Sequence, residues 1–224
     1  DTGAAGVLIG FDTSPEFFDL EVNPDYFENI DGVVRNCIIE RTQWAGVGLY
    51  AAKNARVYNN TIVDTAQTHH SPIYFGLSFQ DWDADAGRPA STTPVIRNNI
   101  VYQSSGVSPT DQYLYIRYAN ELGGMSALEG MPQMSNNLYF REDGSGQFQD
   151  RRPDSSFTGS LSQWQDHAGA DQSSQEVDPL LSDSVRLMQE SPAIDAGYDL
   201  GDELNYDFFG NERLVDIDIG AEEF

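Results

Sequence analysis

The stretch Val34-Arg35-Asn36-Cys37-Ile38-Ile39 decides the fold, because the chain repeats its pattern three more times. Each copy is a short apolar strand with one or two Asn in its middle, although Asn is disfavoured in strands and favoured at bends. The other copies are Val57-Tyr58-Asn59-Asn60-Thr61-Ile62, Ile96-Arg97-Asn98-Asn99-Ile100-Val101 and Met134-Ser135-Asn136-Asn137-Leu138-Tyr139. Internal repeats outweigh other fold signals, and this one indicates strands that turn a corner at Asn.

A parallel β-helix explains such strands. Its coils stack about 4.8 Å apart, so that Asn amides at equivalent positions can hydrogen-bond along the stack, and Asn tolerates the left-handed backbone of a tight corner. A second apolar strand precedes each copy, at residues 7–11, 47–51, 73–79 and 113–118. We therefore predict an all-β fold, a right-handed parallel β-helix of about four coils. The alternative is an ordinary β-sandwich with Asn at its strand ends, and the four aligned strand pairs favour the β-helix over it.

The repeat stops after Phe140, so we expect the coils in residues 1–140 and a capping segment in residues 141–224. Residues 141–158 are polar and predict a loop, whereas residues 160–167 predict a short helix that ends at Gly169. Residues 1–6 lead directly into the first strand. Because the ends of natural β-helices are covered, we expect either N-terminal coils of the same protein before this strand or end-to-end self-association.

The charge balance excludes some partners. Lys and Arg number 12 and Asp and Glu number 36, which gives a net charge of −24. Such a surface repels nucleic acid and anionic membranes, and no apolar run reaches transmembrane length. The balance favours calcium binding, a high-salt setting or secretion. The single cysteine, Cys37, excludes an intrachain disulfide, and its place in the repeat predicts a buried structural thiol.

Asp81, Asp83 and Asp85 are the best metal candidates in the sequence. They alternate ahead of Gly87 and resemble the front half of a calcium loop, in which alternate carboxylates converge on one ion. The glycine comes one place late and no Glu follows at the expected distance, so this is not an EF-hand. We expect calcium as a possible cofactor here.

Three long insertions, at residues 12–31, 80–93 and 121–132, all follow a first strand. Stacked coils would place them on one side as the rim of a groove, and a groove along a β-helix suits a polymer. The alternation of the first strands turns outward Tyr50, Tyr74, Ser78, Tyr115 and Arg117. Rings suit sugar stacking and Arg suits carboxylate binding, although exposed Tyr also suits an ordinary β surface. His69 and His70 could be a base or a metal pair, but adjacent residues in an extended chain point to opposite sides.

The tail carries a more specific pattern. It contains Leu161-Ser162-Gln163-Trp164-Gln165, Asp178-Pro179-Leu180-Leu181, S-P-A-I-D-A-G at 191–197, D-F-F-G-N-E-R at 207–213 and D-I-G-A-E-E-F at 218–224. This pattern resembles the closing segment of secreted bacterial right-handed parallel β-helix proteins, among them the choice-of-anchor Q proteins, which are similar in architecture to pectate- and alginate-lyase-like enzymes. The resemblance implies an exported, carbohydrate-related protein and supplies no catalytic residues. As a lower cap, the tail would close the core with Trp164, Leu180, Leu181, Leu187, Ile194, Phe208, Phe209, Leu214, Ile217 and Ile219.

The functional expectation is a secreted or cell-surface protein that acts on polysaccharide, as a calcium-assisted lyase or a C-terminal fragment of one. In such a lyase a basic residue removes the proton next to a uronate carboxylate whose charge is offset. Arg117 would bind the uronate, Lys53, the chain's one lysine, would be the base, and Tyr50, Tyr74, Ser78 and Tyr115 would bind substrate. The alternatives are a non-catalytic glycan-binding or surface-interaction module and a glycoside hydrolase, which needs two carboxylates about 5 to 9.5 Å apart.

Overall fold

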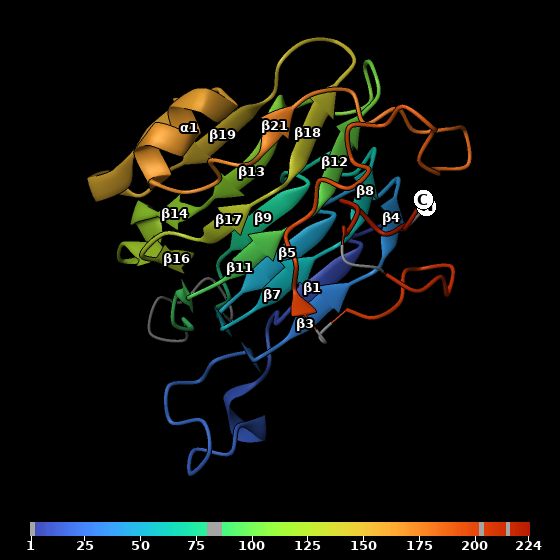
Figure 1. Ribbon diagram of the computed structural model, residues 1–224. Helices are drawn as coiled ribbons and strands as arrows, with labels where there is room; N and C mark the ends of the chain where they lie inside the picture. The colour runs from blue at the N-terminus through green and yellow to red at the C-terminus, as the bar shows by residue number, and fades with distance from the viewer. Residues whose placement is uncertain (1–2, 80–86, 202–203, 214–215) are drawn as a thin grey trace.

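The computed structural model describes residues 3–79, 87–201, 204–213 and 216–224. It is a β-solenoid of about four turns, in which strands from successive coils pair in parallel sheets (Figure 1). The predicted parallel β-helix is therefore confirmed, and the β-sandwich alternative is wrong.

The coils share one plan of four short strands each. The first coil contains β1 (Val7–Ile9), β2 (Asn29–Ile30), β3 (Val33–Arg35) and β4 (Ile38–Glu40). The second contains β5 (Val47–Tyr50), β6 (Ala52–Lys53), β7 (Arg56–Tyr58) and β8 (Thr61–Val63). The third contains β9 (Ile73–Gly76), β10 (Ser91–Thr92), β11 (Val95–Arg97) and β12 (Ile100–Gln103). The fourth contains β13 (Gln112–Ile116), β16 (Leu128–Glu129), β17 (Gln133–Ser135) and β18 (Leu138–Arg141).

The Asn residues lie where the strand pairs β3–β4, β7–β8, β11–β12 and β17–β18 turn a corner. The first Asn of each corner has a left-handed φ, at 50° for Asn36, 51° for Asn59, 54° for Asn98 and 53° for Asn136. Asn adopts this conformation at lower cost than most residues. The corner predicted from the repeat is confirmed.

The second position of each corner forms a buried ladder of amides. Asn60 accepts at Oδ1 from the Cys37 backbone N–H (3.1 Å), Asn99 accepts from the Asn60 N–H (3.2 Å), and Asn137 accepts from the Asn99 N–H (3.0 Å). Each Asn therefore bonds to the coil before it, and the ladder has one direction. It ends at buried Asp171, whose Oδ1 accepts from Asn137 Nδ2 at 3.1 Å.

Cys37 occupies the first slot of this ladder. It is half-buried, not buried as expected, because β4 lies at the end of its sheet. The Cys37 thiol donates to the Arg35 carbonyl at 3.1 Å, and partial burial raises its pKa. A thiol with a raised pKa in this position is a structural residue, not a nucleophile.

Strands β1, β5, β9, β13 and β19 (Gln147–Asp150) form one parallel sheet, hereafter the first sheet. Strand β20 (Phe157–Gly159) pairs with β19 antiparallel, so residues 141–158, predicted as loop, contain most of two short strands and η4 (Pro153–Ser155). The predicted helix is α1 (Leu161–Ala168), with a capping box at Ser160 and a left-handed Gly169 at its end. The Trp164 ring stacks on Phe148 at 5.4 Å in the main core. Helix α1, which carries Trp164, lies beside β19 (Figure 1).

Beyond β21 (Gln175–Glu176) the tail runs back along the outside of the Asn corner. Side-chain amides of the corner Asn residues donate to tail carbonyls, from Asn136 to Ala196 (3.0 Å), from Asn98 to Tyr198 (2.9 Å) and from Asn59 to Asp218 (2.9 Å). The first Asn of each corner, whose side chain points outward, thus binds the tail. We call the tail beyond β21, residues 177–224, the strap. This use of the Asn residues was not evident from the repeat.

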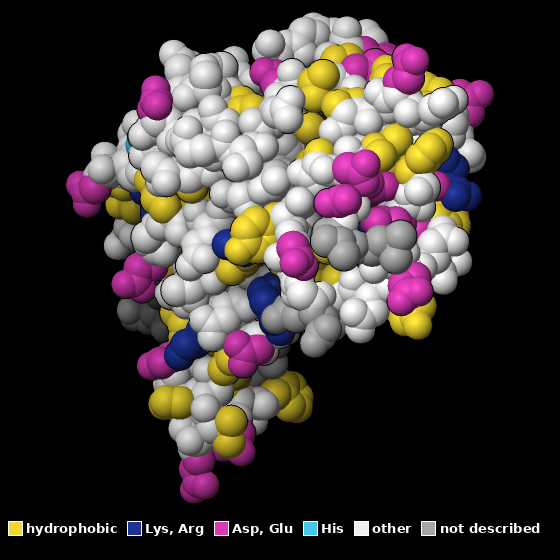
Figure 2. Space-filling view, in the orientation of Figure 1, with side chains coloured by type: hydrophobic (Ala, Val, Ile, Leu, Met, Phe, Trp, Pro, Cys, Tyr) yellow, Lys and Arg dark blue, Asp and Glu magenta, His cyan; other side chains and the backbone are white. Residues whose placement is uncertain are grey.

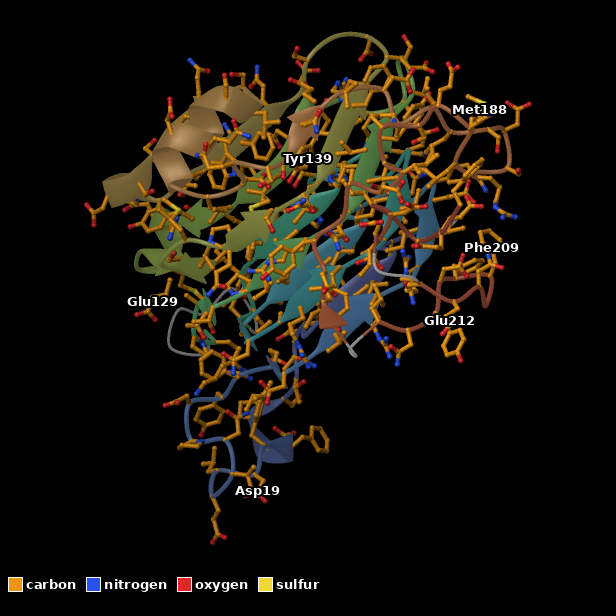
Figure 3. The ribbon with its side chains drawn as sticks, viewed as in Figure 1. Asp19, Glu129, Tyr139, Met188, Phe209 and Glu212 are labelled. Carbon is orange, nitrogen blue, oxygen red and sulfur yellow. The ribbon has the colours of Figure 1, made fainter. Side chains whose placement is uncertain are left out.

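The strap does not close the core as expected from its apolar residues. Leu187 and Ile219 pack outside the corner, in a separate cluster with Ile100 and Leu138. Phe208 and Phe209 are 51% and 41% exposed, and Phe209 lies in an outer loop of the strap (Figure 3). Leu214 lies outside the described residues. Among the nine of these apolar residues that the structure describes, Trp164 is the one that packs in the main core.

Two of the insertions are held together by a buried ion pair. The loop at residues 10–28, which includes η1 (Pro15–Phe17), projects from the solenoid with Asp19 at its tip (Figure 3). Its Glu28 pairs with Arg88 of the second insertion at 3.0 Å, and both side chains are almost fully buried. The third insertion forms a hairpin of β14 (Tyr118–Ala119) and β15 (Met125–Ser126) around η3 (Asn120–Leu122). These insertions all leave the same edge of the first sheet.

Candidate functional site

Two adjoining cavities lie on the outer face of the first sheet, with volumes of about 450 and 400 Å³. Both are lined by His69, His70 and Arg117. The larger one extends under the first insertion to Phe11, and the smaller one extends across the sheet to Arg151. We call the two together the first-sheet groove.

The register of the sheet builds the floor of this groove. Gly48, Tyr74, Tyr115 and Gln149 are aligned across four neighbouring strands. The Tyr74 and Tyr115 rings stack with centroids 5.7 Å apart and planes at 1°. Stacked rings on one face of a sheet follow from the period of two along each strand. The predicted outward register of the first strands is therefore correct.

Most of the predicted substrate-binding side chains are covered. Tyr50, Tyr74 and Ser78 are only 5%, 3% and 4% exposed, because the loops and rings beside them close over the sheet. Ser78 Oγ donates to the Phe11 carbonyl and so fastens the first insertion. Tyr115 and Arg117 remain partly exposed. The expectation of a flat, exposed row of Tyr rings is corrected to a narrow groove over buried rings.

His70 lines this groove, although the sequence analysis did not place it among the predicted site residues. Its ring stacks on Tyr74 at 4.0 Å with planes at 11°, and its Nδ1 is buried without a hydrogen-bond partner among the described residues. Its φ is 72°, so this segment is not extended and the argument that His69 and His70 face opposite sides fails. Burial, with the nearby charges of His69 and Arg117, lowers the pKa of His70 to about 4.

Arg117 supplies positive charge to both cavities. Its guanidinium forms a hydrogen bond with the Tyr74 side chain, whose pKa burial raises to about 12 despite the opposing effect of Arg117. Arg151 lines the smaller cavity with Arg117, and its guanidinium approaches the Gln149 side-chain amide to 2.8 Å. Sequence reasoning missed Arg151 and Gln149 because they follow or lie in β19, inside a segment read as loop.

Lys53 and the metal candidates are not brought to this groove. Lys53 lies on β6, in another sheet, with its Nζ 5.3 Å from the centre of the Phe27 ring, and it lines neither cavity. Asp81, Asp83 and Asp85 lie outside the described residues. Within the described part of the chain, no group of three or more His, Cys, Asp or Glu is arranged to hold a metal ion.

A larger hollow, of about 860 Å³, lies in the tail, where acidic side chains gather. Its carboxylates bind the chain itself, since Asp218 accepts from the backbone N–H of Asp195 (2.7 Å) and of Phe224 (2.6 Å) and Glu222 accepts from the Leu187 N–H (2.7 Å). Figure 2 shows acidic side chains spread over one face of the molecule, in keeping with the net charge of −24. This hollow is a product of strap packing, and the first-sheet groove is the better candidate site.

Comparisons with protein-family models, with curated proteins and with solved structures found no match to the chain. In the described residues, no helix is long and apolar enough to cross a membrane. The function must therefore be argued from the groove itself.

Proposed function

We propose that the first-sheet groove binds a polysaccharide that carries carboxylates and that the protein is a polysaccharide lyase, acting at the cell surface or after secretion. The observation that carries the proposal is the pair Arg117 and Arg151, which line one cavity of a chain with a net charge of −24. Positive charge gathered at one place on an acidic protein selects an anionic ligand locally, and guanidinium groups match carboxylates in geometry.

The other walls of the groove suit a sugar. Trp44 lines the larger cavity and Tyr115 the smaller, and both are partly exposed, so each offers an aromatic surface for stacking. Gln112 and Gln149 add amides that can hydrogen-bond hydroxyl groups. The resemblance of the tail to the choice-of-anchor Q proteins of the pectate- and alginate-lyase-like superfamily supports a carbohydrate ligand and export.

Elimination fits the groove better than hydrolysis. A hydrolase needs two carboxylates across the substrate, and Asp12 is the one carboxylate among the described residues that line either cavity. A lyase needs a cationic group at the uronate carboxylate and a proton acceptor, and Arg117 and His70 lie in both cavities. Calcium bound by Asp81, Asp83 and Asp85 would be a second means of offsetting the charge of the substrate carboxylate.

The test is binding and cleavage of a panel of uronate polymers, with a neutral glucan as the control polymer. We expect one or more uronate polymers to bind and to yield unsaturated, ultraviolet-absorbing ends. Arg117→Ala should weaken binding about tenfold or more, since it removes a charge-assisted contact, whereas Arg35→Ala, at an exposed Arg on β3, should not. Equal binding of the neutral glucan, or no binding at all, would refute the proposal. Binding without cleavage would leave a non-catalytic glycan-binding module.

A further inference from the structure

We propose that His70 is the catalytic residue that takes the proton from a uronate sugar in this groove. The inference rests on the proposed function and deepens it, because it replaces Lys53 as the base with a residue that lines the groove. The substrate class is a polymer with a carboxylate that Arg117 can bind and with a glycosidic oxygen on the carbon beyond the acidic C–H.

The position of the imidazole supports this role. His70 lines both cavities and therefore lies at their junction, as Arg117 does. The ring is fixed by the parallel stack on Tyr74 at 4.0 Å and by the edge of Trp44 at 5.7 Å. A ring held in this way loses little freedom when it reacts, which is how a protein positions a proton acceptor.

One ring nitrogen of His70, Nδ1, makes no hydrogen bond to the described part of the protein. Most buried polar atoms have a hydrogen-bond partner, and an unpaired one costs about 1 to 3 kcal/mol. His70 Nδ1 is buried and, among the described residues, has no partner. Its backbone adds to the cost, since φ is 72° for a residue that is not glycine. Strain and unpaired groups of this kind gather at functional sites. Nδ1 is enclosed by the protein, whereas the ring as a whole is partly exposed, so a substrate in the groove meets the ring at Nε2.

Burial, with the charges of His69 and Arg117, keeps the His70 ring neutral, and the charge of Arg117 couples the ring to the substrate. The lowered pKa, about 4, leaves the imidazole unprotonated and able to accept a proton near neutral pH. The charged and titratable groups that face it across the groove are His69, Tyr74, Arg117, Asp12, Tyr50, Tyr115 and Arg151. A uronate carboxylate on Arg117 offsets the charge that helps to lower this pKa. Substrate binding should therefore make His70 more basic when the proton is to be removed.

The reaction step balances without a further reagent. The C–H bond next to the uronate carboxylate breaks, and its proton goes to His70 Nε2, since Nδ1 is enclosed by the protein. Its electron pair forms the new carbon–carbon double bond while the glycosidic C–O bond breaks with its electrons on oxygen. The imidazolium then returns the proton to that oxygen. Arg117 stabilises the negative charge that develops on the carboxylate during the step.

The test compares His70→Asn with His167→Asn, both in the full chain, on a polymer that the wild-type protein cleaves. Asn tolerates the left-handed backbone at position 70. His167 lies on α1, where it contacts Ser155 and Phe157, and it does not line the groove. For His70→Asn we expect kcat to fall about 10²- to 10⁴-fold with little change in KM, and the acidic limb of the pH–rate profile to disappear. His167→Asn should keep both. Equal losses in binding and turnover would assign His70 a structural role and overturn the inference.

A second measurement does not depend on the variant folding. Imidazole NMR titration of the wild-type protein should place the pKa of His70 well below the usual value for His and should show it rise when an oligouronate binds. An unshifted His70 resonance on binding would overturn the inference. If a uronate polymer binds through Arg117 but is never cleaved, the catalytic role of His70 is wrong while the binding part of the proposed function stands. If no uronate polymer binds, the proposed function itself fails.

Discussion

The Tyr50 ring lies over Gly76 of the following coil. A Cβ built on Gly76 would lie 2.6 Å from Tyr50 Cδ1 and closer still to Cε1 and Cζ, and one built on Gly48 would lie 2.8 Å from Cε2. Tyr50 therefore lies flat on the first sheet because neighbouring positions carry no side chain. The buried ring in turn supports Tyr74, 5.9 Å away between centroids, on which His70 stacks.

Gly76→Ala tests this relationship. The added methyl cannot fit beneath the ring, so we expect a loss of about 1 to 3 kcal/mol in the free energy of unfolding, as for other overpacked sites. In a Tyr50→Ala background the same substitution should cost much less, and the double-mutant cycle measures the coupling. Gly3→Ala is the control, because nothing lies within 4 Å of that position. Additive costs in the cycle would show that Tyr50 and Gly76 do not depend on each other.

The sequence predicts the solenoid well because each coil repeats the same local rule. Asn36, Asn59, Asn98 and Asn136 all have the left-handed backbone that the repeat indicated, and the period of two along the first strands placed Tyr115 and Arg117 on the groove side. The direction of the ladder could not be predicted, since it depends on which coil each amide reaches.

Asn99→Ala should be among the most destabilising changes in the chain. Asn99 Nδ2 donates to the Val57 and Arg97 carbonyls, and its Oδ1 accepts from Asn60. Removal of the amide leaves several buried groups unpaired, and we expect a loss of about 2 to 4 kcal/mol, measured by chemical denaturation. Cys37→Asn, at the same slot of the first coil, is the matched comparison. It should cost little, because the slot is half-buried at the end of the ladder. Similar costs at both sites would contradict the one-directional ladder.

Asp171, where the ladder ends, should make stability depend on pH. Burial raises the pKa of this carboxyl, although Ser174, Asn137 and Tyr139 donate hydrogen bonds to it. A raised folded-state pKa means that the native state binds the proton more tightly. Its contribution to stability is therefore complete below the unfolded pKa of about 3.9 and is lost as pH rises through the folded value.

Asp171→Asn removes this titration but keeps an oxygen for Asn137 and Ser174. The melting temperature of the variant minus that of the wild type should therefore become more positive as pH increases above about 4. Thermal melts across this range measure the difference, and Asp178→Asn is a control at an exposed carboxylate. A difference that is constant with pH would show that Asp171 titrates alike in the folded and unfolded chains.

The groove was less predictable than the solenoid, because its lining comes from loops and from the rings that cover it. Burial of Tyr50 and Tyr74 depends on Trp44 and His70, which no period relates to the first strands, and on Phe11, which lies beyond the end of β1. The outer Asn of each corner gave no sign that it would bind the tail, since those contacts join residues 60 to 170 positions apart.

The exposed edge of the first coil is the surface on which we most expect a protein partner to bind. Within the described residues, β1, β2, β3 and β4 each lie at the end of a sheet, and Ile30 and Val33 are 43% and 39% exposed there. Unpaired strand edges with apolar neighbours recruit further strands. We expect this edge to pair with a second copy of the chain.

Light scattering across a range of protein concentrations tests whether two copies of the chain associate through this edge. We expect the average mass of the chain to rise with concentration and to return to that of a single chain in Ile30→Lys/Val33→Lys, because charged residues block edge pairing. Val22→Lys, at an exposed apolar position in the projecting loop, adds the same type of charge elsewhere and should leave association unchanged. In the first coil Cys37 takes the place of the ladder Asn, so its side chain cannot continue the amide ladder into a coil stacked on this edge. Association should therefore depend on backbone pairing and on Ile30 and Val33. A mass that never exceeds that of one chain, in a preparation without added coils, would rule out self-association through this edge.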